Sequence, residues 1–187
     1  MTTYSYHFLT LSGGAPAFAK ALAADPAKAG GRPLGLFTPQ LGWESAQAAL
    51  LVQGSGGDVG ALPGVVGRQS WTLTPILRPR AEEALKPGGI HVHRWFEVDA
   101  ANAEEFVALS GHAWPDFEAG FDANIFGLFL AQPAPADRAS LLLITRYASH
   151  GVWEDSRDPT TEAMQIFARR RALTRNTRAA STLLTPL

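Results

Sequence analysis

Gly35-Leu36-Phe37 recurs later in the chain as Gly127-Leu128-Phe129, and this short repeat decides how the sequence is interpreted. At the same offset, Leu50-Leu51-Val52 falls on Leu142-Leu143-Ile144. The two halves also end alike, because Ser70, Leu73, Thr74 and Pro75 match Ser181, Leu184, Thr185 and Pro186. Since the matches occur in the same order, the chain is predicted to contain one structural unit written twice.

Each copy is predicted to fold in the order strand, helix, strand, strand, helix, strand, which is the ferredoxin-like pattern. Its first strand is rich in aromatic and β-branched residues, at 4–11 in one copy and 91–98 in the other. Such a unit leaves one sheet face bare and apolar, and a second copy can cover it. The predicted fold class is α+β, with two tandem ferredoxin-like repeats that form an α+β barrel within one chain and carry helices on the outer faces.

The expected domains are repeat one at 1–79, a linker at 80–89 and repeat two at 90–187. The second helix of repeat one is expected to be degenerate, because residues 54–67 contain six glycines. Each glycine costs a helix about 1 kcal/mol relative to alanine. If that helix is lost, part of the outer face of the first sheet would be less covered, which favours a partner or self-association surface there.

Repeat two carries clearer helix signals. Asn102 followed by Glu105 has the spacing of a capping box at the start of its first helix. Pro115 lies inside the same helical pattern and is expected to kink or interrupt it, because proline removes a backbone donor. A short helix around 149–156 and a longer one after Pro159 are predicted to follow.

Composition excludes several functional classes. The 187 residues have a net charge of -1 and no cysteine, so neither disulfides nor thiol catalysis nor cysteine-ligated metal can occur. The near-neutral charge predicts neither nucleic acid nor membrane as a partner. Residues 1–10 lack the pattern of a signal peptide, so a cytoplasmic location is expected.

Alternation along the strand at 91–98 places His91, His93, Trp95 and Glu97 on one face. Phe96 and the other alternate residues suit packing beneath helices, so the histidine face is expected to point into the barrel. The predicted ligand-binding residues are Tyr4, Tyr6, Phe8, His91, Trp95, Glu97 and Trp114. The alternative is that Arg94 faces the barrel and the histidines lie at a rim or an interface.

Two histidines are the candidate catalytic residues. His93 would accept a proton inside the barrel, and His112, beside Pro115, would be aimed into a cavity by a kinked helix. In the alternative interpretation, His112 caps a broken helix and Trp114 fills core space. His91 and His93 could chelate a metal together with Glu97, but a closely spaced third histidine is missing, so no metal is predicted.

A cluster of arginines follows Pro159. Arg169, Arg170, Arg171, Arg175 and Arg178 are distributed around a helix and its end, without an aromatic stacking platform. A solvated helix face is therefore predicted for them, in preference to an anion or RNA site.

Four stretches of the second half together resemble the NIPSNAP family, which belongs to the dimeric α+β barrel superfamily. They are His91–Val98, His112-Ala113-Trp114-Pro115, Asn124-Ile125-Phe126-Gly127-Leu128-Phe129, and Arg146-Tyr147 ahead of a short helix. The resemblance implies the fold. The superfamily includes cofactor-free oxygenases of polycyclic aromatics, heme-degrading oxygenases, heme-dependent dehydratases and binding modules, and the fold does not choose among these.

The predicted function is to bind a small aromatic or apolar molecule in the barrel interior. A cofactor-independent oxygenase or isomerase is the leading hypothesis for an activity, although the sequence leaves open whether the protein is an enzyme. The alternatives are a non-catalytic binding or interaction protein and a heme-binding protein with His93 or His112 as ligand. The expected partners are a small-molecule ligand and further copies of the chain in a homo-oligomer.

Overall fold

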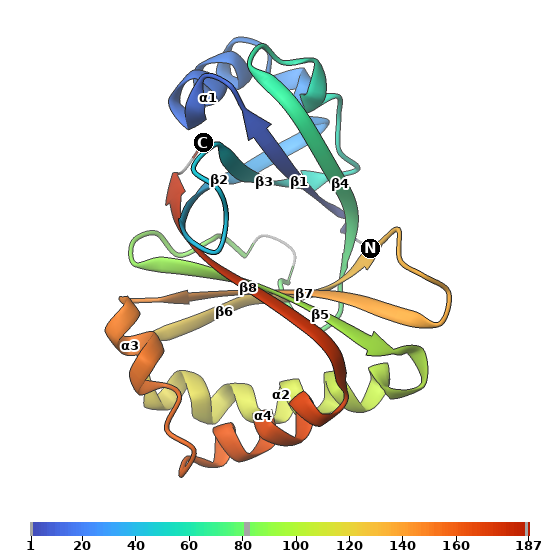
Figure 1. Ribbon diagram of the computed structural model, residues 1–187, viewed down its shortest axis with the longest axis vertical. Coiled ribbons are helices and arrows are strands. Elements are labelled where there is room, and N and C mark those ends of the chain that lie inside the picture. Colours follow the sequence, from blue (N-terminus) through green and yellow to red (C-terminus); the bar gives the residue numbers. More distant parts are fainter. Residues whose placement is uncertain (1, 81–82, 186) are drawn as a thin grey trace.

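The computed structural model describes residues 2–80, 83–185 and 187 (Figure 1). Three residues covered by the sequence predictions therefore lie outside the described residues, namely Ala81 and Glu82 of the expected linker and Pro186 of the repeated ending. Met1, at the start of the segment tested for a signal peptide, also lies outside them.

The strands and helices follow a similar order along the two halves of the chain. The first half consists of β1 (Tyr4–Leu11), α1 (Gly14–Ala24), η1 (Pro26–Ala29), β2 (Gly31–Leu41), β3 (Gln47–Gly54), η2 (Val59–Ala61) and β4 (Val65–Pro75). The second half consists of β5 (Ile90–Asp99), η3 (Ala100–Asn102), α2 (Ala103–Gly120), β6 (Ala123–Gln132), β7 (Arg138–Tyr147), α3 (His150–Asp155), α4 (Glu162–Ala172) and β8 (Thr174–Thr185).

The strands form one closed antiparallel barrel in the order β1-β3-β2-β8-β5-β7-β6-β4. Within each half the last strand lies beside the first, and the halves join where β2 pairs with β8 and β4 pairs with β6. The last strand of each half is thus paired with the second strand of the other half. In Figure 1, α1 lies outside the sheet of the first half, and α2 and α4 lie outside that of the second. This arrangement confirms the predicted fold class.

The repeated tripeptides occupy equivalent places in the barrel. The register of β2 shifts between Pro33 and Gly35, and that of β6 shifts between Ile125 and Gly127. A bulge inserts a residue and bends its strand, and glycine allows another segment to approach closely there. At Gly127 that segment is the backbone of Arg78, and at Gly35 it is the side chain of Leu184.

Three apolar clusters fill the molecule. One lies inside the barrel and includes Tyr4, Tyr6, Phe37 and Phe129. A second lies between the sheet of the second half and its helices, and a third lies between the sheet of the first half and α1. Each sheet thus has apolar side chains packed on both of its faces. The inner faces of the two sheets share the cluster inside the barrel, and the outer face of each sheet has a cluster of its own.

Between β3 and β4, residues 55–64 form only the short 3₁₀ turn η2. This agrees with the predicted degenerate helix, but the expected gap in the cover of the first sheet is wrong. Val59 and Leu62 of this segment are buried against the outer face, together with α1. A glycine-rich loop can cover a sheet without being a helix, because its chain lies flat against the strands.

Two details of α2 differ from the sequence prediction. The helix runs from Ala103 to Gly120 without interruption at Pro115, because buried side chains on both sides of the proline hold it on the sheet. The missing backbone hydrogen bond is one among many, and the packing outweighs it. Asn102 occupies the N-cap position, but its side chain makes no capping hydrogen bond, since Asn102 is the last residue of the turn η3 and has helical backbone angles.

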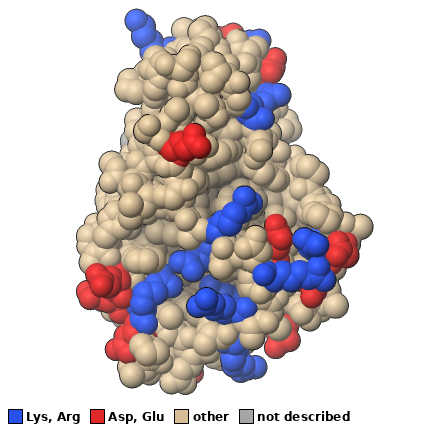
Figure 2. Space-filling view, viewed as in Figure 1, with Lys and Arg blue, Asp and Glu red and all other residues tan. Residues whose placement is uncertain are grey.

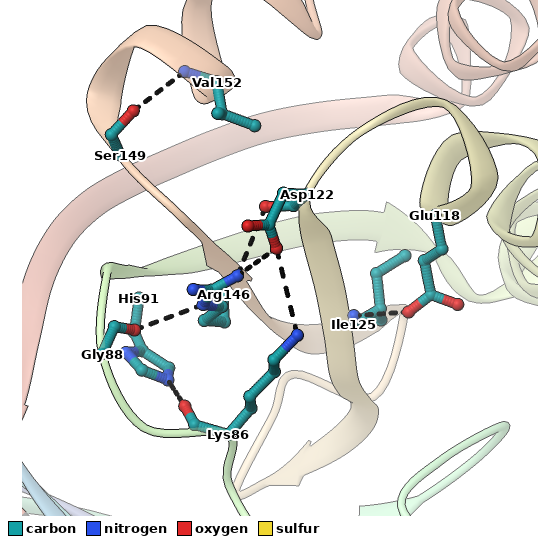
Figure 3. A network of polar contacts seen from close by, with 9 residues as sticks. All are labelled: Lys86, Gly88, His91, Glu118, Asp122, Ile125, Arg146, Ser149 and Val152. Atoms are coloured by element: carbon teal, nitrogen blue, oxygen red, sulfur yellow. Dashed lines mark hydrogen bonds and ion pairs between the residues drawn. The ribbon is translucent and has the colours of Figure 1, made fainter.

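The segment before β5 is tied to the second sheet by polar contacts (Figure 3). His91 Nε2 donates to the carbonyl oxygen of Lys86 over 3.1 Å. Arg146 Nε donates to the carbonyl oxygen of Gly88 over 3.2 Å, and the same guanidinium pairs with Asp122.

None of the helices in the described ranges is long and apolar enough to span a membrane.

Candidate functional site

Two cavities lie on opposite sides of the second sheet. The barrel pocket has a volume of about 250 Å³ and is lined by side chains that point into the barrel. The sheet–helix cavity has a volume of about 580 Å³ and lies between the outer face of the same sheet and the helices. Because alternate residues of β5 point to opposite faces, this one strand contributes to both.

The barrel pocket is built around His93 and Tyr6. The Nδ1 atom of His93 lies 2.9 Å from the Tyr6 hydroxyl, and His93 is only 1% exposed. The ring of Phe37 packs edge-on against the imidazole at 4.3 Å between centroids, and that of Trp43 does so at 5.3 Å. A wall of further aromatic rings includes Trp71. The histidine is thus fixed by one hydrogen bond and by aromatic packing.

Burial determines the protonation of this pair. It lowers the pKa of His93 well below its ordinary value, and the nearby His91 lowers it further. Burial also raises the pKa of Tyr6 well above its ordinary value. Both groups are therefore neutral at pH 7. When Nδ1 carries the proton and donates to Tyr6, Nε2 has a free lone pair. Within the described residues, Nε2 has no hydrogen-bond partner.

The structure brings together four of the predicted site residues, since Tyr6, Phe8, His93 and Trp95 line the barrel pocket. Arg94 points to the helix side instead and lines the other cavity, so the alternative interpretation with Arg94 in the barrel is wrong. The assignment of faces from strand alternation was therefore correct for this strand.

Three predicted ligand-binding residues of the barrel lie outside the pocket. Tyr4 is buried and packs against Phe129 with ring centroids 5.4 Å apart. His91 is fully buried and hydrogen-bonded to the linker. Glu97 lies at the end of β5, where its carboxylate is 3.4 Å from Arg138 and partly exposed.

His112 and Trp114 lie on α2, on the outer side of the second sheet. His112 is exposed, so the expectation that a kinked helix aims it into a cavity is wrong. The helix continues through Pro115, and His112 therefore stays on its solvent side. Trp114 is buried and lines the sheet–helix cavity, where it is separated from His93 by the sheet.

The sheet–helix cavity is lined mainly by apolar side chains from every layer around it. The sheet contributes Val92, Phe96, Ile125 and Leu143, and the helices and their connections contribute Trp114, Phe117, Trp153, Pro159, Met164, Phe167 and Ala168. Four aromatic rings on the helix side thus face a mostly aliphatic sheet. This lining suits a flat apolar ligand.

Four arginines also line this cavity, namely Arg94, Arg157, Arg170 and Arg171, and no carboxylate of the described residues lines it. Figure 2 shows Lys and Arg side chains gathered over the part of the molecule where β8 and α4 lie. Arg170 is only 6% exposed, so the predicted solvated helix face is wrong for this residue. Its guanidinium lies 4.4 Å from the Phe167 ring centroid and donates to the Ser110 hydroxyl over 3.2 Å.

The sequence contained one signal for this cavity. Arg94 alternates with Val92 and Phe96 on the face that packs beneath helices, which is an unusual place for a charge. The burial of Arg170 had no such signal. Its neighbours Arg169 and Arg171 are exposed, and a run of three arginines is typical of a solvated helix end.

The residues do not fit a histidine-ligated heme site. Among the described residues that line the larger cavity there is no histidine. His112 is exposed, and His93 lies in the small barrel pocket with one ring nitrogen bonded to Tyr6. In the ranges 2–80 and 83–185, no group of three or more His, Asp or Glu residues is arranged to hold a metal ion.

Solved structures with the same fold include proteins of several descriptions. An anthrone oxidase-like protein matches with a TM-score of 0.68 at 12% identity, over 98% of this chain and 91% of its own. A ferredoxin fold protein related to antibiotic biosynthesis monooxygenases, from Listeria monocytogenes, matches with a TM-score of 0.55 at 13% identity, over 100% and 97%. A heme-degrading enzyme from the same species matches with a TM-score of 0.54 at 12% identity, over 96% and 98%.

The resemblance to the NIPSNAP family receives little support. A NIPSNAP family protein from Agrobacterium tumefaciens matches 55% of this chain and 92% of its own, at 17% identity and a TM-score of 0.42. No protein-family model and no curated protein matches the sequence. At these identities the structural matches show the fold alone, which is that of ferredoxin-like α+β barrel proteins.

Proposed function

We propose that this protein binds a small aromatic or apolar molecule in the sheet–helix cavity. The observation that carries the proposal is the cavity itself, whose volume of about 580 Å³ lies within the range of roughly 300–1,000 Å³ found for ligand sites. The barrel pocket, at about 250 Å³, is smaller than that range. The ligand expected in the barrel interior is therefore better accommodated on the other side of the second sheet.

The test uses 2-naphthamide, a neutral planar aromatic probe, with binding measured by calorimetry and by quenching of tryptophan fluorescence. Ala168→Phe places a ring at the cavity wall and is expected to weaken binding at least about tenfold, because it fills space that the probe needs. Ala172→Phe is the matched control, since Ala172 is an exposed residue of the same helix that does not line the cavity. Equal binding by both variants would disprove the proposal.

The barrel pocket supports a second candidate function, proton transfer by His93. The supporting observation is a buried neutral imidazole with one nitrogen unpartnered beside aromatic rings. Such a base could serve a cofactor-independent oxygenase or isomerase by accepting a proton from a small planar substrate. Phenol is a suitable probe. It is expected to shift the Nε2 resonance of His93 in nitrogen-labelled protein, and an unchanged resonance would remove this role.

A further inference from the structure

The charge inside the sheet–helix cavity is unbalanced. In the described part of the chain, Arg94, Arg157, Arg170 and Arg171 form no ion pair, although other arginines of the second half pair with carboxylates. Arg170 is buried and Arg94 and Arg157 are partly buried, whereas Arg171 is exposed at the cavity rim. Taking unpaired like charges out of water is costly, because each loses hydration and repels the others. The protein nevertheless keeps these side chains around one apolar space.

The hydrogen-bond partners of these arginines are neutral. Arg157 donates to the Tyr147 hydroxyl over 3.2 Å, and Arg170 donates to Ser110. The Nε atom of Arg157 is buried and, among the described residues, has no partner. The indole N–H groups of Trp114 and Trp153, which also line the cavity, are likewise buried without partners. Several donors thus border the space, while the described part of the chain contributes no carboxylate acceptor to its lining.

The arginines are close enough to influence each other. Burial lowers the pKa of Arg170, and the positive charges of Arg94 and Arg157 lower it further. Burial also lowers the pKa of Arg94, with Arg157 and Arg171 adding to the effect. Arg94 and Arg170 nevertheless remain cationic at neutral pH, because an arginine starts from a pKa above 12. The aromatic rings around Arg170 offset part of its cost, whereas Arg157 has one such ring, that of Trp153.

We propose that the ligand of the sheet–helix cavity is an aromatic carboxylate, with its ring system among the apolar side chains and its carboxylate at Arg157 and Arg94. This inference rests on the proposed function. A carboxylate suits the guanidinium, because two parallel N–H groups can donate to its two oxygens. The mostly apolar lining favours one charged group on an uncharged body, as in an aromatic acid, over a highly charged phosphate ester.

The test compares 2-naphthoate with 2-naphthamide, which share their ring and shape and differ by one charge. Wild-type protein is expected to bind the carboxylate at least about tenfold more tightly, since a hydrogen bond to a charged partner contributes more than a neutral one. Arg157→Gln is expected to abolish most of this preference and to change binding of the amide less than about threefold. Arg169→Gln, an equal charge change at an exposed residue of α4 outside the lining, is the control and should keep the preference.

The outcomes separate the two levels of the proposal. If neither probe binds, or if Ala168→Phe weakens neither, the proposed function itself fails. If both probes bind equally and Ala168→Phe weakens both, the cavity binds aromatics and the carboxylate inference is overturned. A loss of preference as large in Arg169→Gln as in Arg157→Gln would also overturn it. The preference for the carboxylate would then come from the net positive charge of this region and not from a contact with Arg157. Should Arg157→Gln fail to fold, Arg94→Gln replaces it.

Discussion

Tyr6 and His93, each on the first strand of its half, meet across the barrel interior through a hydrogen bond of 2.9 Å. Their strands, β1 and β5, are not neighbours in the sheet order, so the contact crosses the interior and does not follow a strand ladder. It is a buried polar link between the two halves, inside a core of aromatic and aliphatic side chains. Such a link fixes how the two sheets face each other, because its length tolerates little sliding.

Removing the Tyr6 hydroxyl should destabilise the protein. Tyr6→Phe leaves the Nδ1 atom of His93 buried without a partner, and we expect a loss of about 1–3 kcal/mol in the free energy of unfolding. Tyr6→Phe combined with His93→Leu should cost less than the sum of the single variants, since no unpaired group remains. Urea denaturation measures all three. A strictly additive double-mutant cycle would mean that the Tyr6 hydroxyl and the His93 imidazole do not interact.

Stability should fall on acidification because of three buried histidines. Burial lowers the pKa of His7 to about 4 and that of His91 to about 4, and it lowers that of His93 well below its ordinary value. In the unfolded chain, histidine titrates near pH 6.5. Below that pH the unfolded state binds protons that the folded state excludes, so the free energy of unfolding decreases from about pH 6.5 down to about 4. Above pH 7 these histidines are neutral in both states and do not make the free energy of unfolding depend on pH.

Urea midpoints at several pH values between about 4.5 and 8 test this dependence. His91→Gln, which retains a side-chain donor for the Lys86 carbonyl, should reduce the slope below pH 6.5 by the share of one histidine, at most about 1.4 kcal/mol per pH unit. A slope unchanged by this substitution would mean that His91 takes up a proton as readily in the folded protein as in the unfolded chain.

The positive charge of Arg170 is expected to contribute little to the stability of the fold. Arg170→Met keeps an unbranched apolar side chain among Phe96, Phe106 and Phe167 and removes one of the clustered like charges. An apolar group of similar volume avoids the desolvation cost that this unpaired buried charge imposes on the folded state. The unfolding free energy of the ligand-free protein should therefore stay the same or rise. A loss of more than about 2 kcal/mol would show that the guanidinium is needed for the fold.

The sequence was informative where a pattern is local and uninformative where packing decides. Alternation along β5 correctly separated His93 and Trp95 from Phe96, because residues of a strand must alternate between faces. The burial of Arg170 depends on how α4 is rotated over the sheet, and no local pattern encodes that rotation. His112 was misplaced for a related reason, since whether Pro115 breaks α2 depends on the apolar contacts around it.

The repeated Gly35 and Gly127 make the two halves comparable in one experiment. Both lie at a register shift, but a Cβ atom on Gly127 would come within 2.7 Å of the Arg78 carbonyl oxygen, which belongs to the backbone. On Gly35 it would meet the end of the Leu184 side chain, which can rotate away. We therefore expect Gly127→Ala to lower the unfolding free energy by about 1–3 kcal/mol, and Gly35→Ala to lower it less.

Gly120→Ala is the control for both glycine variants, since nothing lies within 4 Å of a Cβ atom there. It should leave stability within about 0.5 kcal/mol of wild type, because a surface substitution without new contacts changes little. Urea denaturation again gives the comparison. If Gly35→Ala proved as costly as Gly127→Ala, the Leu184 side chain would be as immovable as a backbone carbonyl. The packing of β8 against Gly35 of β2 would then be as tight as the packing of Arg78, which follows β4, against Gly127 of β6.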